Sequence, residues 1–164
     1  MTILLHEVVS DMHFQYMGQT GTVSLWYKGL QVPRYRAVPS GSRQFFRLGE
    51  YFIKAEYVFK DYSGQCADEI YIQKKISPPD KKYFTKLLAC SDVVSEGIQW
   101  TMFPWYNLTP ASHNSNVFEV CYKQVVSLCR RYQIYDVAYA FNTNWYIHNG
   151  RPLIVDCGIG GQSE

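Results

Sequence analysis

The chain of 164 residues lacks several features that mark particular classes of protein. No apolar run approaches the length that a helix needs to cross a bilayer. His6 and Glu7 come too early for the first residues to be a signal peptide. Charged residues make up only 18% of the chain, the net charge is +2, and no basic stripe is present. We therefore expect neither a membrane partner nor a nucleic-acid partner.

Cysteine and histidine patterns that bind metal are also missing. The five cysteines are an odd number, are widely spaced and include no Cys-x-x-Cys pair. The four histidines have no spacing that would suit metal ligands. Scattered free cysteines are typical of a reducing compartment. The sequence thus predicts a cytoplasmic protein without a structural zinc site.

Aromatic residues, in contrast, are abundant. They make up 16% of the chain and include fourteen tyrosines. This composition, with the low charge content, is typical of a packed globular protein and excludes a disordered one. The length suits one domain with a single core.

Strand-like and helical patterns alternate along the chain. Gly49-Glu50 and Asn149-Gly150 each join two short apolar runs, which predicts a β-hairpin at each place. The other expected elements are a helical start over residues 1–16 with Thr2 as its cap, a β-rich run over 22–28, a helix over 63–76, a short helix or turn over 80–90, a hairpin from Val93–Ser95 and 98–103, and a long helix over 116–132.

Apolar residues with the helical period define the faces that we expect to be buried. Glu69 lies on the apolar face of its helix, together with Cys66, Ile72 and Ile76. Arg130 and Arg131 are expected to be solvated at the end of the long helix. The apolar face of that helix is Val117, Val120, Cys121, Val125, Leu128, Cys129 and Tyr132.

Lys54 stands inside an otherwise apolar strand, between Ile53 and Ala55. Alternation along a strand would turn it outward, and this interpretation is favoured when Lys54 is considered alone. Glu69 favours an inward-facing Lys54 instead, because a carboxylate on an apolar face needs a partner. Together the two residues predict a Lys54–Glu69 ion pair beneath the loop of residues 40–43.

Two acids and an amide follow one another near the C-terminus. Asp136 precedes Asn144, and the hairpin through Asn149-Gly150 leads from Asn144 to Asp156. In phosphoryl transfer a first acid receives the proton of the attacking hydroxyl, and an amide and a second acid hold Mg²⁺. The hairpin brings the ends of two strands together, so Asn144 and Asp156 can converge on one ion.

These segments resemble the protein-kinase-like fold over roughly residues 35–158, and in particular the short kinase-like proteins encoded by bacteriophages. Residues 40–55 resemble the glycine loop, second strand and lysine strand, and residues 66–70 the regulatory helix with its acid. Residues 98–106 resemble the strand and hinge whose backbone receives an adenine edge. The resemblance implies an α+β fold, with an antiparallel N-lobe sheet and helix and a truncated C-lobe of a long helix and catalytic hairpin. Residues 1–34 would be an extension packed on one minimal kinase-like domain, 35–164.

The resemblance also implies ATP and Mg²⁺ as cofactors, with a role for each matching residue. Asp136 would act as the base, Lys54 would orient the phosphates and Glu69 would hold Lys54. Asn144 and Asp156 would be the metal ligands. The remaining nucleotide contacts would be Ser40, Gly41, Ser42, Phe103 and Trp105.

The chain departs from the kinase pattern in ways that bear on activity. Seven residues, Val137 to Thr143, separate the acid from the amide, where kinases have four. The loop of residues 40–43 has one glycine, and only six residues follow Gly158, where we expect the platform for an acceptor to be absent. We therefore favour a pseudokinase-like protein that binds nucleotide and acts mainly on a host or phage protein in the host cytoplasm. The alternatives are an active ATP/Mg²⁺-dependent phosphotransferase and a structural α+β protein without nucleotide.

Overall fold

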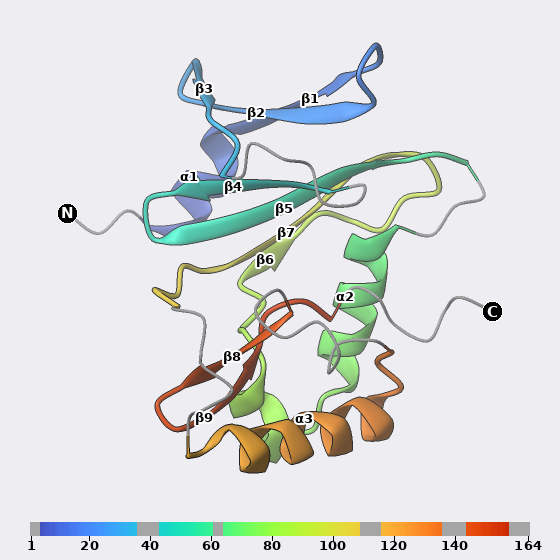
Figure 1. Cartoon of the computed structure of the whole chain (residues 1–164). Coiled ribbons are helices and arrows are strands. Elements are labelled where there is room, and N and C mark those ends of the chain that lie inside the picture. The colour runs from blue at the N-terminus through green and yellow to red at the C-terminus, as the bar shows by residue number, and fades with distance from the viewer. Residues whose placement is uncertain (1–3, 36–42, 61–63, 109–115, 136–143, 158–164) are drawn as a thin grey trace. The chain divides into compact units, whose positions relative to one another are not determined.

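A computed structural model describes residues 4–35, 43–60, 64–108, 116–135 and 144–157 of the chain. These residues form an α+β structure with antiparallel sheets (Figure 1), as the sequence predicts. The chain divides into two compact units, each with its own core. Unit 1 contains residues 1–64 and 89–105, and unit 2 contains residues 65–88 and 106–164. None of the described helices combines the length and apolarity that crossing a membrane requires.

Unit 1 begins with a helix and a three-stranded antiparallel sheet. The helix α1 (Leu5–Asp11) leads into β1 (Met12–Met17), β2 (Thr22–Tyr27) and β3 (Leu30–Val32), in the order β1-β2-β3. The expectation of a helix through residue 16 is wrong. From Met12 onward every second side chain is exposed, and this period of two is the pattern of a strand. Thr2 lies outside the described residues, and Leu4 occupies the N-cap position without a side-chain cap.

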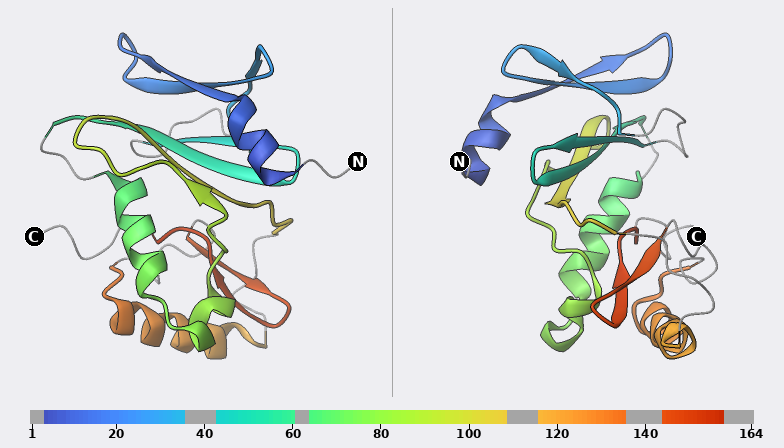
Figure 2. Two further views of the ribbon diagram at one scale, coloured as in Figure 1. Left: turned by 180° about the vertical axis from the view of Figure 1, so that it is seen from behind. Right: turned by 60° about the vertical axis from the view of Figure 1, so that its left-hand side comes forward.

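A four-stranded antiparallel sheet forms the second layer of unit 1 (Figure 2). It contains β4 (Gln44–Leu48), β5 (Tyr51–Val58), β6 (Ala89–Cys90) and β7 (Gly97–Pro104), in the order β4-β5-β7-β6. The predicted turn at Gly49-Glu50 is confirmed, since Leu48 pairs with Tyr51 across it. The expected strand Val93–Ser95 is wrong. The strand that precedes β7 and pairs with it is β6, and Val93 and Val94 are exposed in the connection between β6 and β7.

The core of unit 1 lies between its two sheets. The first 34 residues share this core with the four-stranded sheet, so the predicted domain boundary after residue 34 falls inside unit 1. One face of β4, β5 and β7 is thereby covered by the N-terminal sheet. The buried core residues are Val8, Val23, Leu25, Val32, Phe46, Ile53, Ala55 and Met102.

Unit 2 contains the longer helices and the last hairpin. Its elements are α2 (Gln65–Lys75), the 3-10 helix η1 (Pro78–Tyr83), α3 (Phe118–Tyr132), β8 (Trp145–His148) and β9 (Arg151–Ile154). The two predicted helices are confirmed, with α2 and α3 starting two residues later than expected. Val120 was wrongly placed on the buried face of α3 and is 62% exposed. The buried stripe is formed by Cys121, Val125, Leu128, Cys129 and Tyr132, and Val120 lies about 100° around the helix from Cys121.

The hairpin β8–β9 turns at Asn149-Gly150 as predicted. Both residues have positive φ, 53° and 74°, which suits the two-residue turn that matches the twist of a hairpin. The core of unit 2 joins this hairpin to α3 and to the segment after η1, where Phe84 forms a parallel bridge with Ile154. The N–H of Thr85 also donates to the carbonyl of Ile154, at 3.0 Å.

Candidate functional site

The predicted site residues are distributed over both units. Lys54, Phe103 and Trp105 belong to unit 1, whereas Glu69, Asn144 and Asp156 belong to unit 2. The remaining predictions fall on Ser40, Gly41, Ser42 and Asp136, which lie outside the described residues.

Lys54 lies on β5 and is buried, with 3% of its surface exposed. It pairs with Phe45 on β4 and Thr101 on β7. Its Nζ is 4.7 Å from the centroid of the Phe103 ring, which favours the ammonium group through a cation–π contact. Strand alternation does turn Lys54 away from the apolar core, as the interpretation of the isolated residue predicts. That interpretation was wrong about exposure, because this second face of the sheet is buried too.

The second face of the sheet carries a buried polar group that we did not predict. Glu56 follows Lys54 by two residues on β5 and has no exposed surface. On β7, Gln99 lies opposite Glu56 and Thr101 lies opposite Lys54. Gln99 and Thr101 are both buried. Arg43, just before β4, is 1% exposed. The two-residue spacing of Lys54 and Glu56 was a usable signal, because it puts both charges on one face.

Gly64 fits closely against the carboxylate of Glu56. A Cβ atom at Gly64 would lie 2.6 Å from Glu56 Oε2 and 2.8 Å from Val58 Cγ2. Real Cβ atoms do not approach other atoms so closely, and both neighbours are buried. A side chain at position 64 would therefore force the side chains of Glu56 and Val58 to move.

The two predicted hinge residues have different surroundings. Phe103 is buried beneath Lys54, whereas Trp105 is half-buried in a surface cluster of aromatic rings. The centroid of the Trp105 ring is 5.0 Å from that of Tyr35 and 4.2 Å from the Arg47 guanidinium carbon. The N–H of Trp105 donates to the carbonyl of Glu50, at 2.7 Å. This backbone donor is thus engaged within unit 1.

Glu69 lies on the buried side of α2 and is 1% exposed, which confirms its predicted position on the apolar face. Its neighbours along that side are Cys66, Ile70 and Ile72. The ion pair with Lys54 would join residues of different units, and it stays a prediction.

Asn144 and Asp156 flank the open end of the β8–β9 hairpin. The carbonyl of Asn144 accepts the N–H of Val155 at 2.8 Å and the N–H of Asp156 at 3.2 Å. The next pair in the ladder, Trp145 with Ile154, is buried and fixes the register. The backbones of the two predicted metal ligands are therefore adjacent.

The donor set at this end of the hairpin suits Mg²⁺. An amide oxygen and a carboxylate are hard oxygen ligands, and Mg²⁺ usually takes one or two carboxylates and completes its shell with phosphates and water. Within the described ranges, no cluster of three or more His, Cys, Asp or Glu side chains could hold a metal by itself. Asn144 and Asp156 would thus hold the ion jointly with a phosphate ligand.

A second polar cluster, around Asp80, was missed by sequence analysis. Asp80 Oδ2 accepts hydrogen bonds from Tyr132 Oη and Arg131 Nη1, both at 2.5 Å, and from Ser77 Oγ at 3.2 Å. The hydrogen bond from the Tyr132 hydroxyl lowers the pKa of the Asp80 carboxyl below its usual value, and the hydrogen bond from Arg131 lowers it further. Arg130 and Arg131 are both exposed, as expected, and Arg131 in addition donates to Asp80 of η1. The cluster fastens η1 to the end of α3.

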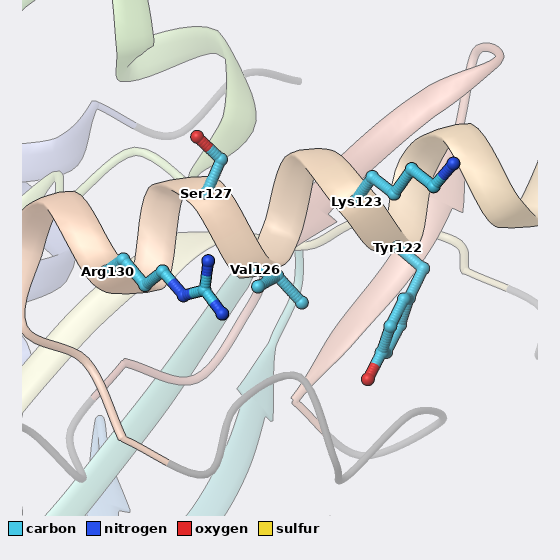
Figure 3. A pocket seen from close by; sticks show the side chains of 5 residues that line it. All are labelled: Tyr122, Lys123, Val126, Ser127 and Arg130. Carbon is cyan, nitrogen blue, oxygen red and sulfur yellow. The ribbon is translucent and has the colours of Figure 1, made fainter.

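One shallow hollow of about 340 Å³ lies on the surface of α3 (Figure 3). Tyr122, Val126 and Arg130 point to one side of the helix, and Lys123 and Ser127 point to the other. None of these five lining residues was predicted to belong to a site. Lys123 also forms an exposed ion pair with Glu119, at 3.3 Å.

No family model matches the chain, and no curated protein matches its sequence. Its function therefore has to be inferred from the residues and their geometry.

Proposed function

We propose that this chain is a kinase-like protein, that it binds a nucleotide together with a divalent cation, and that it acts mainly by binding another protein. The observation that carries the nucleotide part is the backbone contact of Asn144 with Val155 and Asp156. It keeps an amide and a carboxylate at one end of a rigid hairpin. Two such ligands leave most of the coordination shell of Mg²⁺ for the phosphates of a nucleotide.

The order of charged residues and elements supports the same proposal. A buried lysine stands on β5, a buried glutamate on α2, a long helix follows, and the hairpin with Asn144 and Asp156 comes last. The resemblance assigns these positions, in this order, to phosphate binding and metal binding. A buried charge is costly without a partner, so Lys54 and Glu69 are more than surface charges. ATP with Mg²⁺ is the ligand that we infer.

The preference for binding over catalysis rests on the loop between Asp136 and Asn144. Its seven residues lengthen the connection that sets the distance between the base and the metal in kinases. The single glycine in residues 40–43 also leaves fewer backbone donors for phosphate. Trp105 contacts both Tyr35 and Arg47 at the surface of unit 1, and these residue types are enriched where proteins bind one another. The partner that we infer is a host protein, if a bacteriophage encodes the chain.

A thermal-shift titration with ATP tests the proposal. A ligand at a hundred times its dissociation constant stabilises the native state by about 2.7 kcal/mol. For a chain of this length that corresponds to a rise of about 5–10 °C in the unfolding midpoint. We expect the rise with ATP and MgCl₂ and a smaller one with ATP and EDTA. No rise with about 10 mM ATP and MgCl₂, which is about 100 times a dissociation constant of about 0.1 mM, would refute nucleotide binding of that strength.

An active phosphotransferase is the second candidate function, favoured by the presence of a residue of the required type at each of the five positions that the reaction uses. In that case Asp136 would accept the proton of the acceptor hydroxyl, and Lys54 would orient the α- and β-phosphates of ATP. A structural α+β protein without a nucleotide is the third candidate, and the titration separates it from the other two.

A further inference from the structure

The strand β1 is the outer strand of the N-terminal sheet (Figure 1). It pairs with β2 over all six residues, Met12 to Met17, and among the described residues no strand pairs with its other edge. Proteins usually protect such an edge with lysine, proline, a bulge or a very short strand. The strand Met-His-Phe-Gln-Tyr-Met has none of these. Its outer edge is therefore built like a strand that receives a partner.

The side chains beside this edge are incompletely covered. On β2 the inward residues Val23 and Leu25 have no exposed surface. On β1 the inward residues Phe14 and Tyr16 are only half-buried, although Phe14 stacks on Trp100 and Tyr16 stacks on Tyr57.

Two exposed apolar residues extend the same rim. Met17 is 41% exposed and Phe59 is 55% exposed, and the Phe59 ring meets that of Tyr16 edge-on. An added strand would cover part of this apolar rim, and burial of apolar surface favours association.

We propose that β1 pairs antiparallel with β1 of a second copy of this chain, around a twofold axis at Gln15. Directly opposed residues of an antiparallel pair lie on the same face of a sheet. A twofold axis through a residue of β1 therefore places exposed side chains of one copy opposite exposed side chains of the other, and half-buried ones opposite half-buried ones. At Gln15 it sets Phe14 opposite Tyr16 and His13 opposite Met17, on the inner and outer faces respectively.

A second copy fits this edge because β1 carries no acidic or basic residue other than His13. Self-pairing therefore brings no like charges into direct opposition, and the Phe14–Tyr16 pairs are of the aromatic type that stabilises sheets. An axis at Gln15 also keeps Asp11 out of the ladder, whereas an axis at Phe14 would draw it in opposite Met17. The proposal does not depend on nucleotide binding.

Sedimentation analysis of the full chain tests the pairing, at protein concentrations from about 1 μM to about 500 μM. We expect the mass to rise with concentration from the 19.1 kDa of the monomer towards twice that value. Gln15→Lys and Gln15→Glu should each stay monomeric, because each sets like charges opposite each other at the axis. An equimolar mixture of the two variants should form the dimer again. Gln31→Lys on β3, at the opposite edge of the same sheet, should dimerise like the unchanged protein.

Circular dichroism should show every variant to be folded, since Gln15 and Gln31 are both exposed. A monomer at every concentration would overturn the proposal, as would a Gln15→Lys variant that still dimerises. A mixture that stays monomeric would overturn the register at Gln15. Loss of the dimer in Gln31→Lys as well would overturn the assignment to β1.

Discussion

Gly64 is the residue at which the smallest change should have a large effect. A methyl group there would meet the carboxylate of Glu56 and a methyl of Val58, both in the buried end of β5. We expect Gly64→Ala to lower the free energy of unfolding by about 1–3 kcal/mol, the usual effect of overpacking. Urea denaturation measures the change.

Gly18→Ala is the matched control for this substitution. The nearest atom to a Cβ at Gly18, in the ring of Tyr16, is 3.8 Å away, which is an ordinary contact. The control should change the free energy of unfolding by less than about 0.5 kcal/mol. Equal effects of the two substitutions would contradict the packing described at Glu56.

Asp156 should be needed for metal-dependent binding and not for folding. Its carboxylate is the charged member of the proposed ligand pair, while its N–H holds the hairpin end. We expect Asp156→Asn to abolish the part of the ATP thermal shift that requires Mg²⁺ and to leave the unfolding midpoint without ligand within about 2 °C. Asp92→Asn, at an exposed position of unit 1, should retain the full shift. A full shift in Asp156→Asn would move the metal site elsewhere.

At the scale of elements, the Asp80 cluster should make stability depend on pH. Tyr132→Phe removes the hydroxyl that donates to Asp80 and accepts the N–H of Ser77. Near pH 6 we expect a loss of about 1–2 kcal/mol in the free energy of unfolding, because the buried Asp80 carboxylate and the part-buried N–H of Ser77 each lose a partner. Tyr135→Phe is the control, since Tyr135 is 52% exposed.

The sign of the pH dependence follows from the lowered pKa of Asp80. Its stabilising effect is complete above the unfolded-state pKa, near 3.8, and disappears as the pH falls through the lower pKa of the native state. The difference between Tyr132→Phe and the unchanged protein should therefore shrink at about pH 3. A difference that is constant or larger at this pH would show that the Tyr132 hydroxyl does not act through the Asp80 carboxylate.

Elements with strong local signals were predictable from the sequence. Gly49-Glu50 and Asn149-Gly150 identified their hairpins because the turn residues and the flanking apolar runs agree. The α3 helix followed from its apolar period, but the error at Val120 shows that period alone does not give the width of the buried stripe. The strand β1 was missed because six residues with apolar positions two apart also fit a loose helical pattern.

The site residues were predictable to different extents. Burial of Glu69 followed from helical spacing alone, and the adjacency of the Asn144 and Asp156 backbones followed from the hairpin. The burial of Glu56 and Arg43 could not be predicted from the sequence, because it depends on which layer covers the second face of the four-stranded sheet. Hydrogen bonds between Asp80 and the end of α3 join residues far apart in sequence, and no local pattern reports them.

For the molecule as a whole, we expect little catalysis by the isolated chain. An error of about 1 Å in positioning the base can cost on the order of 10²-fold in rate. In the proposed kinase-like site, the seven residues between Asp136 and Asn144 would be the source of such an error. ATP hydrolysis and autophosphorylation, measured as release and incorporation of labelled phosphate, should be slow or undetectable. Robust turnover that disappears in Asp136→Ala would establish the phosphotransferase instead.

The division of the chain into two units has a consequence for how the protein is made. Each unit is assembled from two separate segments, and the segment of residues 65–88 interrupts unit 1. On the ribosome, β5 emerges well before its partner β7, and α2 emerges before α3, β8 and β9. Residues 65–88 therefore emerge before the rest of unit 2 and cannot complete its core until residues 106–164 have been made. Pairing that spans such distances is slow, and the newly made chain exposes apolar surface meanwhile.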